Sequence, residues 1–157
     1  VSDNDAANQL VRILGNGKDT AGQEAVNTYC KNNGYTDTSM GRMLLEKASA
    51  NENYTSARDC SVFLKNVYEN KLEHSEEMLN LLKQQTRTEK IPKGIPDSVE
   101  TANKTGELDH VENDAAIVFD GENPYIICVM ADNLSDTTEA RQRIVDISSV
   151  VYENISK

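Results

Sequence analysis

Two apolar, β-branched runs separated by one short polar segment constrain the fold of this chain more than any other feature. The runs are residues 115–119 (AAIVF) and residues 125–130 (YIICVM), and the turn-forming sequence from Gly121 to Pro124 separates them. Two such runs joined by a short polar connection predict a β-hairpin. A segment containing Lys104-Thr105-Gly106 leads into the first run and is predicted to be a third strand. We therefore expect an antiparallel three-strand meander.

Helical spacing of apolar residues accounts for most of the remaining sequence. Helices are predicted at residues 5–14, from Asp19 or Thr20 to a stop at residues 32–34, from Thr55 to Tyr68, from a Ser75 cap to Leu82, and from Ser135 or Asp136 to the C-terminal end. The expected buried faces include Ala6, Leu10, Ile13 and Leu14 in the first helix, Met78, Leu79, Leu81 and Leu82 in the fourth, and Ala140, Ile144, Ile147, Val151 and Ile155 in the last.

The order of these elements predicts an α+β arrangement of helical region, strand meander and covering C-terminal helix. Residues 1–90 are expected to be mainly helical with an Ω-type loop at residues 35–53, and residues 97–157 to hold the strands and the last helix, all within one domain. Three strands and one helix would leave the other face of the sheet and at least one edge uncovered. Natural domains avoid an exposed apolar edge, so we expect the chain to be part of a domain.

Composition excludes several classes of function. The 157 residues include 26 acidic and 16 basic side chains, a net charge of −10, which argues against nucleic acid or an anionic membrane as the main partner. No apolar run approaches the roughly 20 residues that span a bilayer, and no signal peptide is visible at the start. Three widely spaced cysteines and two isolated histidines fit no metal or disulfide pattern. We expect no metal and no cofactor.

The Lys104-Thr105-Gly106 triplet carries the most chemistry. A strand with this sequence holds an ammonium near a hydroxyl, and the glycine lets a substrate lie close to the backbone. Such a strand edge can bind a carboxylate and offer a backbone N–H to a developing oxyanion. A surface lysine on a strand is the simpler alternative.

A second triplet, Ser2-Asp3-Asn4, begins the chain just before the first helix. Together and in this order, the two triplets resemble those of the penicillin-recognising serine hydrolases, most closely the class A β-lactamases. Residues 91–96 (IPKGIP) and 113–118 (NDAAIV) extend the similarity. The resemblance implies a β-lactamase/transpeptidase-like α/β/α fold, a β-lactam or D-alanyl peptide as substrate, and a location outside the cytoplasmic membrane.

The resemblance also implies roles for individual residues. Ser2 and Lys104 would be catalytic: the Ser2 hydroxyl relays a proton to the departing nitrogen of the substrate, and Lys104 attracts its carboxylate. Helix capping is the alternative for Ser2 and for Asn4, and Asp3 is expected to be structural. Four residues would bind substrate: Asn4 its side-chain amide, Thr105 its carboxylate, Gly106 by leaving space, and Glu107 through a backbone N–H in the oxyanion hole.

The nucleophile of the family is not found in this sequence. Its Ser-x-x-Lys motif lies upstream of Ser-Asp-Asn, and no serine here has lysine three positions later. The chain therefore resembles the C-terminal part of the domain, and the N-terminal part of the same domain is the expected partner. Without nucleophile and second oxyanion donor, the chain alone is expected to be inactive.

One position departs from the class A pattern. In class A enzymes, one loop carries a glutamate two residues after an arginine, and this glutamate activates the deacylating water. If Arg42 is the matching arginine, Leu44 holds the glutamate position, and Glu46 is the nearest acid and the candidate base. Two alternatives to a β-lactamase therefore stay open: a penicillin-binding protein or D-alanyl-D-alanine peptidase, and a non-catalytic module with this fold.

Overall fold

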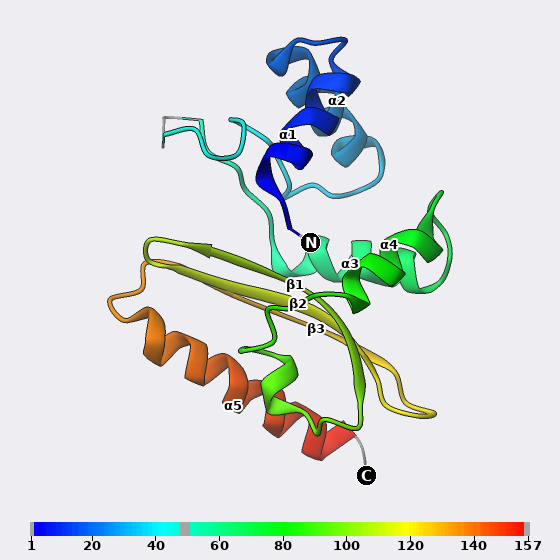
Figure 1. The fold of residues 1–157 in the computed structure, drawn as a ribbon, viewed down its shortest axis with the longest axis vertical. Helices are drawn as coiled ribbons and strands as arrows, with labels where there is room; N and C mark the ends of the chain where they lie inside the picture. Colours follow the sequence, from blue (N-terminus) through cyan, green and yellow to red (C-terminus); the bar gives the residue numbers. More distant parts are fainter. Residues whose placement is uncertain (1, 48–50, 156–157) are drawn as a thin grey trace. The chain divides into compact units, whose positions relative to one another are not determined.

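The computed structural model describes residues 2–47 and 51–155, and in these ranges helices precede a single sheet (Figure 1). The chain forms two compact units, residues 1–59 and residues 60–157, which we call the N-terminal unit and the C-terminal unit. The elements are α1 (Asn4–Leu14), α2 (Asp19–Asn32), α3 (Ala57–Tyr68), α4 (Ser75–Lys83), the 3-10 turn η1 (Pro92–Gly94), β1 (Glu100–Leu108), β2 (Val111–Phe119), β3 (Tyr125–Ala131) and α5 (Thr137–Ile155). The predicted α+β class is confirmed.

Close packing of two helices organises the N-terminal unit. A Cβ atom on Gly22 of α2 would lie 2.1 Å from the carbonyl oxygen of Val11 in α1, so only glycine allows this approach. The helix face that includes Val11 therefore packs against α2. The predicted buried face of α1 was wrong, because Leu10, Ile13 and Leu14 are exposed.

The loop that follows α2 is held by side-chain hydrogen bonds to its backbone. The Asn27 amide accepts from Met40 N–H at 2.6 Å and donates to Met40 O at 3.0 Å. Ser39 and Tyr54 form an isolated antiparallel bridge, and Asn53 Oδ1 accepts from the N–H groups of Gly41 and Arg42. Residues 48–50 of the expected Ω-type loop lie outside the described residues.

The sheet in the C-terminal unit has the strand order β1-β2-β3, and both pairs are antiparallel. Lys104 of β1 lies opposite Ala115 of β2, and Gly106 lies opposite Asn113. The predicted meander is confirmed. Within the described residues, no strand pairs with the outer edge of β1 or of β3.

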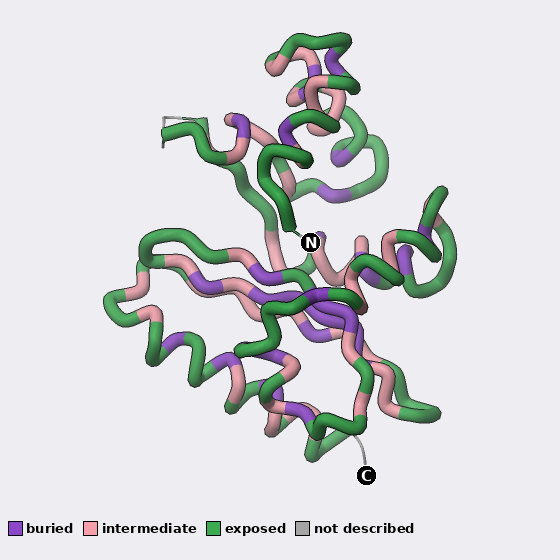
Figure 2. The backbone as a smooth tube through the Cα atoms, in the orientation of Figure 1, coloured by how far each residue is buried: buried purple, intermediate pink, exposed green. Residues whose placement is uncertain are grey.

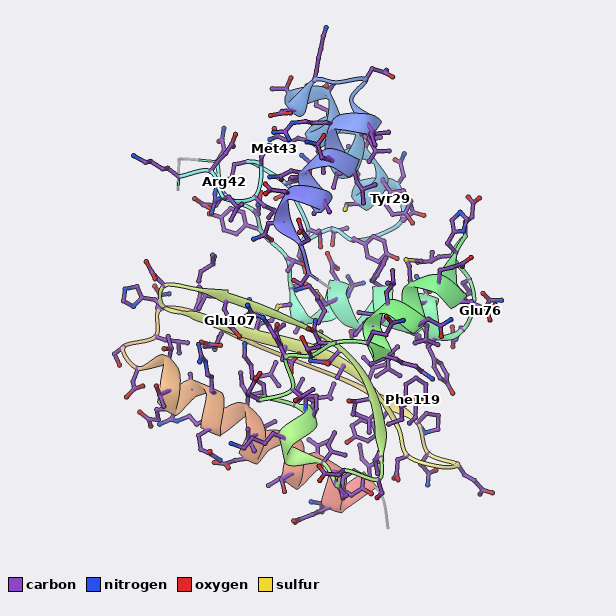
Figure 3. All side chains as sticks on the ribbon, viewed as in Figure 1. Tyr29, Arg42, Met43, Glu76, Glu107 and Phe119 are labelled. Carbon is purple, nitrogen blue, oxygen red and sulfur yellow. The ribbon has the colours of Figure 1, made fainter. Side chains whose placement is uncertain are left out.

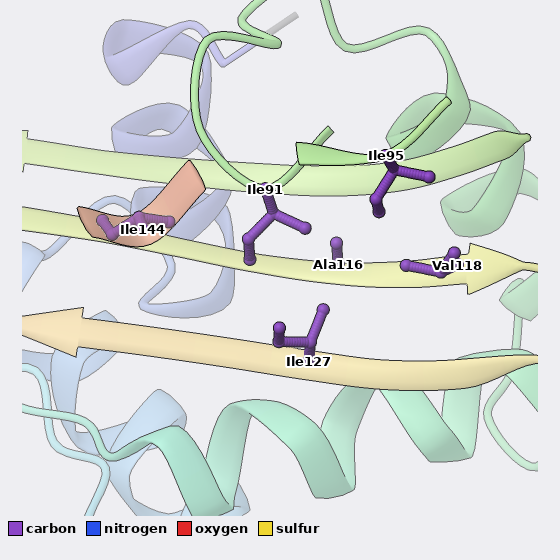
Figure 4. Close-up of a cluster of buried hydrophobic side chains, with 6 residues drawn as sticks. All are labelled: Ile91, Ile95, Ala116, Val118, Ile127 and Ile144. Carbon is purple, nitrogen blue, oxygen red and sulfur yellow. The ribbon is translucent and has the colours of Figure 1, made fainter. Parts of the chain in front are cut away.

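Helices cover both faces of this sheet, and many residues of its strands are buried, drawn purple in Figure 2. One face packs against α5 and η1 through a cluster of Ile91, Ile95, Ala116, Val118, Ile127 and Ile144 (Figure 4). The other face packs against α3 and α4. Its apolar side chains are Leu64, Ala102, Ala115 and Ile117, with Leu79 and Leu82 against them. The expectation of an uncovered face was therefore wrong, because α3 and α4 supply the cover.

One helix start and two buried faces differ from the predictions. Ser75 does not cap α4 but lies buried in its first turn, where its hydroxyl donates to Leu72 O at 2.7 Å. Leu81 in α4 is exposed. In α5, Ile147 and Ile155 are exposed, and Ser148 is buried beside Ile147.

Ser148 shows why α5 turns this face inward. Its hydroxyl donates to Ile91 O at 2.8 Å, so it satisfies a buried carbonyl beside η1. Asp136 caps the helix by accepting from the N–H groups of Thr138 and Glu139. In the part of the chain that the structure describes, no helix has the length and apolar character needed to cross a membrane.

Candidate functional site

The predicted substrate-binding residues of the C-terminal unit lie together on β1, an edge strand. Side chains alternate along a strand. Lys104 and Gly106 therefore share the face that packs against α3 and α4, and Thr105 and Glu107 share the face toward α5. The structure thus brings the ammonium and the hydroxyl to neighbouring positions on opposite faces of one edge.

Lys104 carries an exposed cation at this edge. Its Nζ donates a hydrogen bond to the carbonyl oxygen of Thr105, so the side chain folds back along the strand. Desolvation by burial, and then the positive charge of Arg87, lower the pKa of the Lys104 ammonium. The carboxylates of Asp114 and Glu107 act on this pKa in the opposite direction, so Lys104 has neighbours of both charges.

Gly106 is not required by the packing of the described chain. A Cβ atom there would lie 3.5 Å from Asn113 Cβ, an ordinary contact, and the residue does not adopt a positive φ. Space therefore remains beside the backbone at this position. The role of Gly106, which is to leave room for a ligand, stays a prediction.

The direction of the Glu107 N–H follows from the neighbouring carbonyl. Lys90 Nζ lies 3.4 Å from Gly106 O and 3.0 Å from Asn113 O, so both carbonyls point into the space between β1 and β2. Within the described residues every peptide bond is trans, and in a trans peptide the N–H points opposite to the C=O. The N–H of Glu107 therefore points away from β2, toward the unpaired edge of β1.

A buried ionic cluster lies beneath this end of β1. The side chains of Lys90 and Glu112 are each 1% exposed, and their charged atoms are 2.7 Å apart. Arg141 of α5 contacts the other carboxylate oxygen of Glu112 at 2.7 Å. Burial alone would raise the pKa of Glu112, but hydrogen bonds from Arg141 and Lys90 hold it below its ordinary value.

A second buried group links β1, β2 and η1. Asp114 accepts from the Asn103 side chain at 3.1 Å and from Ile91 N–H at 3.0 Å. Burial raises the pKa of the Asp114 carboxyl in spite of these hydrogen bonds. Sequence reasoning missed both clusters. The available signal was the polar residues at alternate positions of β2, which share the face occupied by Ala116 and Val118.

The other predicted site residues belong to the N-terminal unit. Ser2 adopts a left-handed conformation with φ 70°, and Asn4 is the first residue of α1. Both are exposed. Asp3 is the cap of α1, and its carboxylate accepts from Ala6 N–H at 2.8 Å. The capping alternative for Ser2 and Asn4 was therefore wrong.

Glu46 is engaged within its own loop, the loop that holds the Arg42 and Met43 labelled in Figure 3. Its carboxylate accepts from Met43 N–H at 3.0 Å, and its carbonyl accepts from Arg42 at 2.7 Å. The backbone of Leu44 is fixed by the Asn8 amide, with both hydrogen bonds at 2.9 Å. The loop thus uses Glu46 as a structural acceptor.

Three solved structures with the fold of this chain are PBP-A and two β-lactamases. PBP-A matches with a TM-score of 0.85 and 23% identity over 98% of this chain and 57% of its own. A β-lactamase from Sphaerobacter thermophilus DSM 20745 matches with a TM-score of 0.84 and 25% identity over 98% of this chain and 59% of its own. An ancestral class A β-lactamase matches with a TM-score of 0.83 and 22% identity over 98% of this chain and 61% of its own. The fold is that of the class A β-lactamases and PBP-A.

The sequence agrees with the fold. The profile of the β-lactamase enzyme family matches residues 1–155, and the chain belongs to this family. No curated protein sequence matches the chain. The predicted family resemblance is confirmed. The chain spans 57–61% of the length of these three solved structures.

Proposed function

We propose that residues 1–157 form the substrate-binding and proton-relay part of a serine hydrolase that opens β-lactams through an acyl-enzyme. One observation carries the proposal. On β1, Lys104 Nζ donates to Thr105 O, and the N–H of Glu107, two residues further along the strand, points away from β2. The nucleophilic serine belongs to residues upstream of Val1, so the chain alone carries out no acyl transfer.

Each side chain has one task in the proposed reaction. Lys104 and Thr105 bind the substrate carboxylate, and Asn4 binds the amide of its side chain. The nucleophile attacks the lactam carbonyl, and the oxyanion that forms accepts from Glu107 N–H. As the C–N bond breaks, the Ser2 hydroxyl passes a proton to the departing nitrogen and regains one from the base that deprotonated the nucleophile.

A penicillin-binding protein or D-alanyl-D-alanine peptidase is the second candidate, and Leu44 favours it. A leucine cannot activate the water that releases the acyl group, and Glu46 is held by Met43 N–H. One structural neighbour is a leucine-to-glutamate mutant of PBP-A in an acyl-enzyme complex with penicillin G. We infer that release of the acyl group is slow in this protein.

The proposal is tested by acylation with a fluorescent penicillin. The protein to use joins residues 1–157 to the residues encoded upstream. Lys104→Ala should weaken labelling about ten- to hundredfold, because a hydrogen bond to a charged group contributes about 1.5–3 kcal/mol. Lys93→Ala, which removes an exposed lysine from η1, is the matched control and should label normally. Equal labelling of the two variants would refute the role of Lys104. A wild-type protein that does not label at all would favour the non-catalytic module.

Release of the acyl group separates the two enzyme candidates. We expect slow release in the wild-type protein and faster release in Leu44→Glu, since the new carboxylate can activate water. The decay of the labelled protein after removal of free penicillin gives both rates. Fast release in the wild type that is lost in Glu46→Gln would instead identify Glu46 as the base of a β-lactamase.

A further inference from the structure

Lys90 has a position that the proposed reaction does not yet explain. It lies in the connection between α4 and η1 and is one of the most deeply buried side chains described. Its Nζ is 2.7 Å from Glu112 Oε2, 3.0 Å from Asn113 O, 3.3 Å from Glu107 Oε1 and 3.4 Å from Gly106 O. Two of these four contacts involve the two residues that form the Gly106–Glu107 peptide.

We propose that Lys90 is a positioning residue that orients and polarises the Gly106–Glu107 peptide. This rests on the proposed function, which gives the Glu107 N–H the task of binding the oxyanion. A cation beside the Gly106 carbonyl draws electron density from the amide nitrogen and makes the N–H a stronger donor. Hydrogen bonds in a chain strengthen one another by about 10–30% each.

Burial is what makes this cation effective. Water screens an exposed charge, whereas a charge in a low-dielectric interior acts at close range with little reorganisation. Glu112 holds the ammonium in place, and Arg141 holds Glu112 through its other oxygen. The donor is therefore aimed and polarised before a substrate arrives.

The other nearby cations act on the Glu107 side chain. Arg87 contacts Glu107 Oε2 at 3.0 Å, and Arg141 lies 3.9 Å from the same atom. Only Lys90, among the contacts that the structure gives, reaches a carbonyl of this peptide and the carbonyl opposite it on β2. Lys90 therefore acts on the peptide itself, whereas Arg87 and Arg141 act on the Glu107 carboxylate.

A three-dimensional NMR correlation of each N–H with the preceding carbonyl carbon reports this peptide in a single peak. On residues 1–157, we expect Lys90→Met to move the Gly106 carbonyl carbon and the Glu107 amide proton upfield, more than any other peptide of β1. Lys83→Met is the matched control, because Lys83 pairs with Glu100 at 2.6 Å at the other end of β1. It should leave the peak unchanged. An unmoved peak in Lys90→Met would overturn the proposal.

A second variant separates polarisation from packing. Because Lys90→Met leaves Glu112 buried without its cation, it can unfold the unit. Replacing both residues in Lys90→Met/Glu112→Met removes the pair, which is often neutral for stability. The peak should stay displaced in this folded variant. Its return to the wild-type position would show that Lys90 only fills space, and the proposal would fail.

Kinetics with penicillin G give a third readout in the longer protein. The oxyanion exists only in the transition state, so Lys90→Met should lower the acylation rate at saturation and leave the binding constant unchanged. The loss should be smaller than the roughly 10²–10³-fold that follows removal of an oxyanion donor. Lys90→Arg, which keeps the charge, should recover part of it. Weakened binding alone would contradict this role. If the wild type is not acylated, the proposed function fails, whereas the NMR result still decides whether Lys90 polarises the peptide.

Discussion

Glu112 is the residue on which the buried charges of the C-terminal unit depend. It is 1% exposed and accepts from Arg141 while pairing with Lys90. Glu112→Gln would leave the Lys90 ammonium without its buried counter-charge, a change that typically destabilises by about 3–5 kcal/mol. Urea denaturation at neutral pH measures this loss. Glu139→Gln is the control, because Glu139 pairs with Arg143 on the exposed side of α5 and should change stability by less than about 1 kcal/mol.

The lowered pKa of Glu112 predicts that the stability lost in Glu112→Gln depends on pH. The folded pKa of Glu112 lies below its unfolded value of about 4.3, so its stabilisation is complete above that pH and disappears as pH falls through the folded pKa. We expect wild type and Glu112→Gln to converge in stability at acid pH, to diverge as pH rises from the folded pKa to about 4.3, and to differ by a constant amount above that pH. A difference that stays constant down to acid pH would show that the Glu112 carboxylate is not the stabilising group.

At the residue scale, the sequence suggested a role for the residues of β1 but none for the charged groups beneath them. Lys104 and Thr105 stand in a motif whose chemistry can be read directly. Lys90 gave no such signal, because lysine in a polar connection is usually solvated. Only the fold shows that this connection passes under β1 and brings the ammonium to Glu112 and Asn113.

At the scale of elements, the closest approach in the C-terminal unit lies between η1 and α5. A Cβ atom on Gly94 would lie 2.4 Å from Val145 O and 2.8 Å from Ser148 Cβ. Gly94→Ala should push η1 away from α5 and destabilise by about 1–3 kcal/mol, as overpacking does. Thermal denaturation measures the effect. The control is Gly106→Ala, where the added atom meets only ordinary contacts and should destabilise little. Equal losses in the two variants would contradict the packing of η1 on α5.

The elements also show which features the sequence patterns predict and which they do not. The β-branched runs and the turn at residues 121–124 predicted β2 and β3 within a few residues, because strand pairing is local here. Helical spacing found α1, α4 and α5 but misassigned part of each buried face. A stripe of apolar residues does not specify which neighbour covers it: Val11 rather than Leu10 faces α2, and Ser148 rather than Ile147 faces Ile91.

At the scale of the whole molecule, the sheet formed by the described residues has two unpaired edges with different meanings. The edge of β1 carries the proposed site. The edge of β3 is apolar, with the sequence YIICVMA, and natural domains rarely leave such an edge unprotected. The chain spans little more than half of its structural neighbours. These observations support the proposal that the N-terminal part of the domain is the partner of this chain and carries the nucleophile.

Intact-protein mass spectrometry, followed by peptide mapping, tests the central claim most directly. The protein that joins residues 1–157 to the upstream residues is incubated with penicillin G. We expect one penicilloyl group per molecule, attached to a serine upstream of Val1, and none on residues 1–157 incubated alone. A protein that gains no penicilloyl group, or one that carries it on a serine within residues 1–157, would contradict the proposal that this chain binds substrate for a nucleophile outside it.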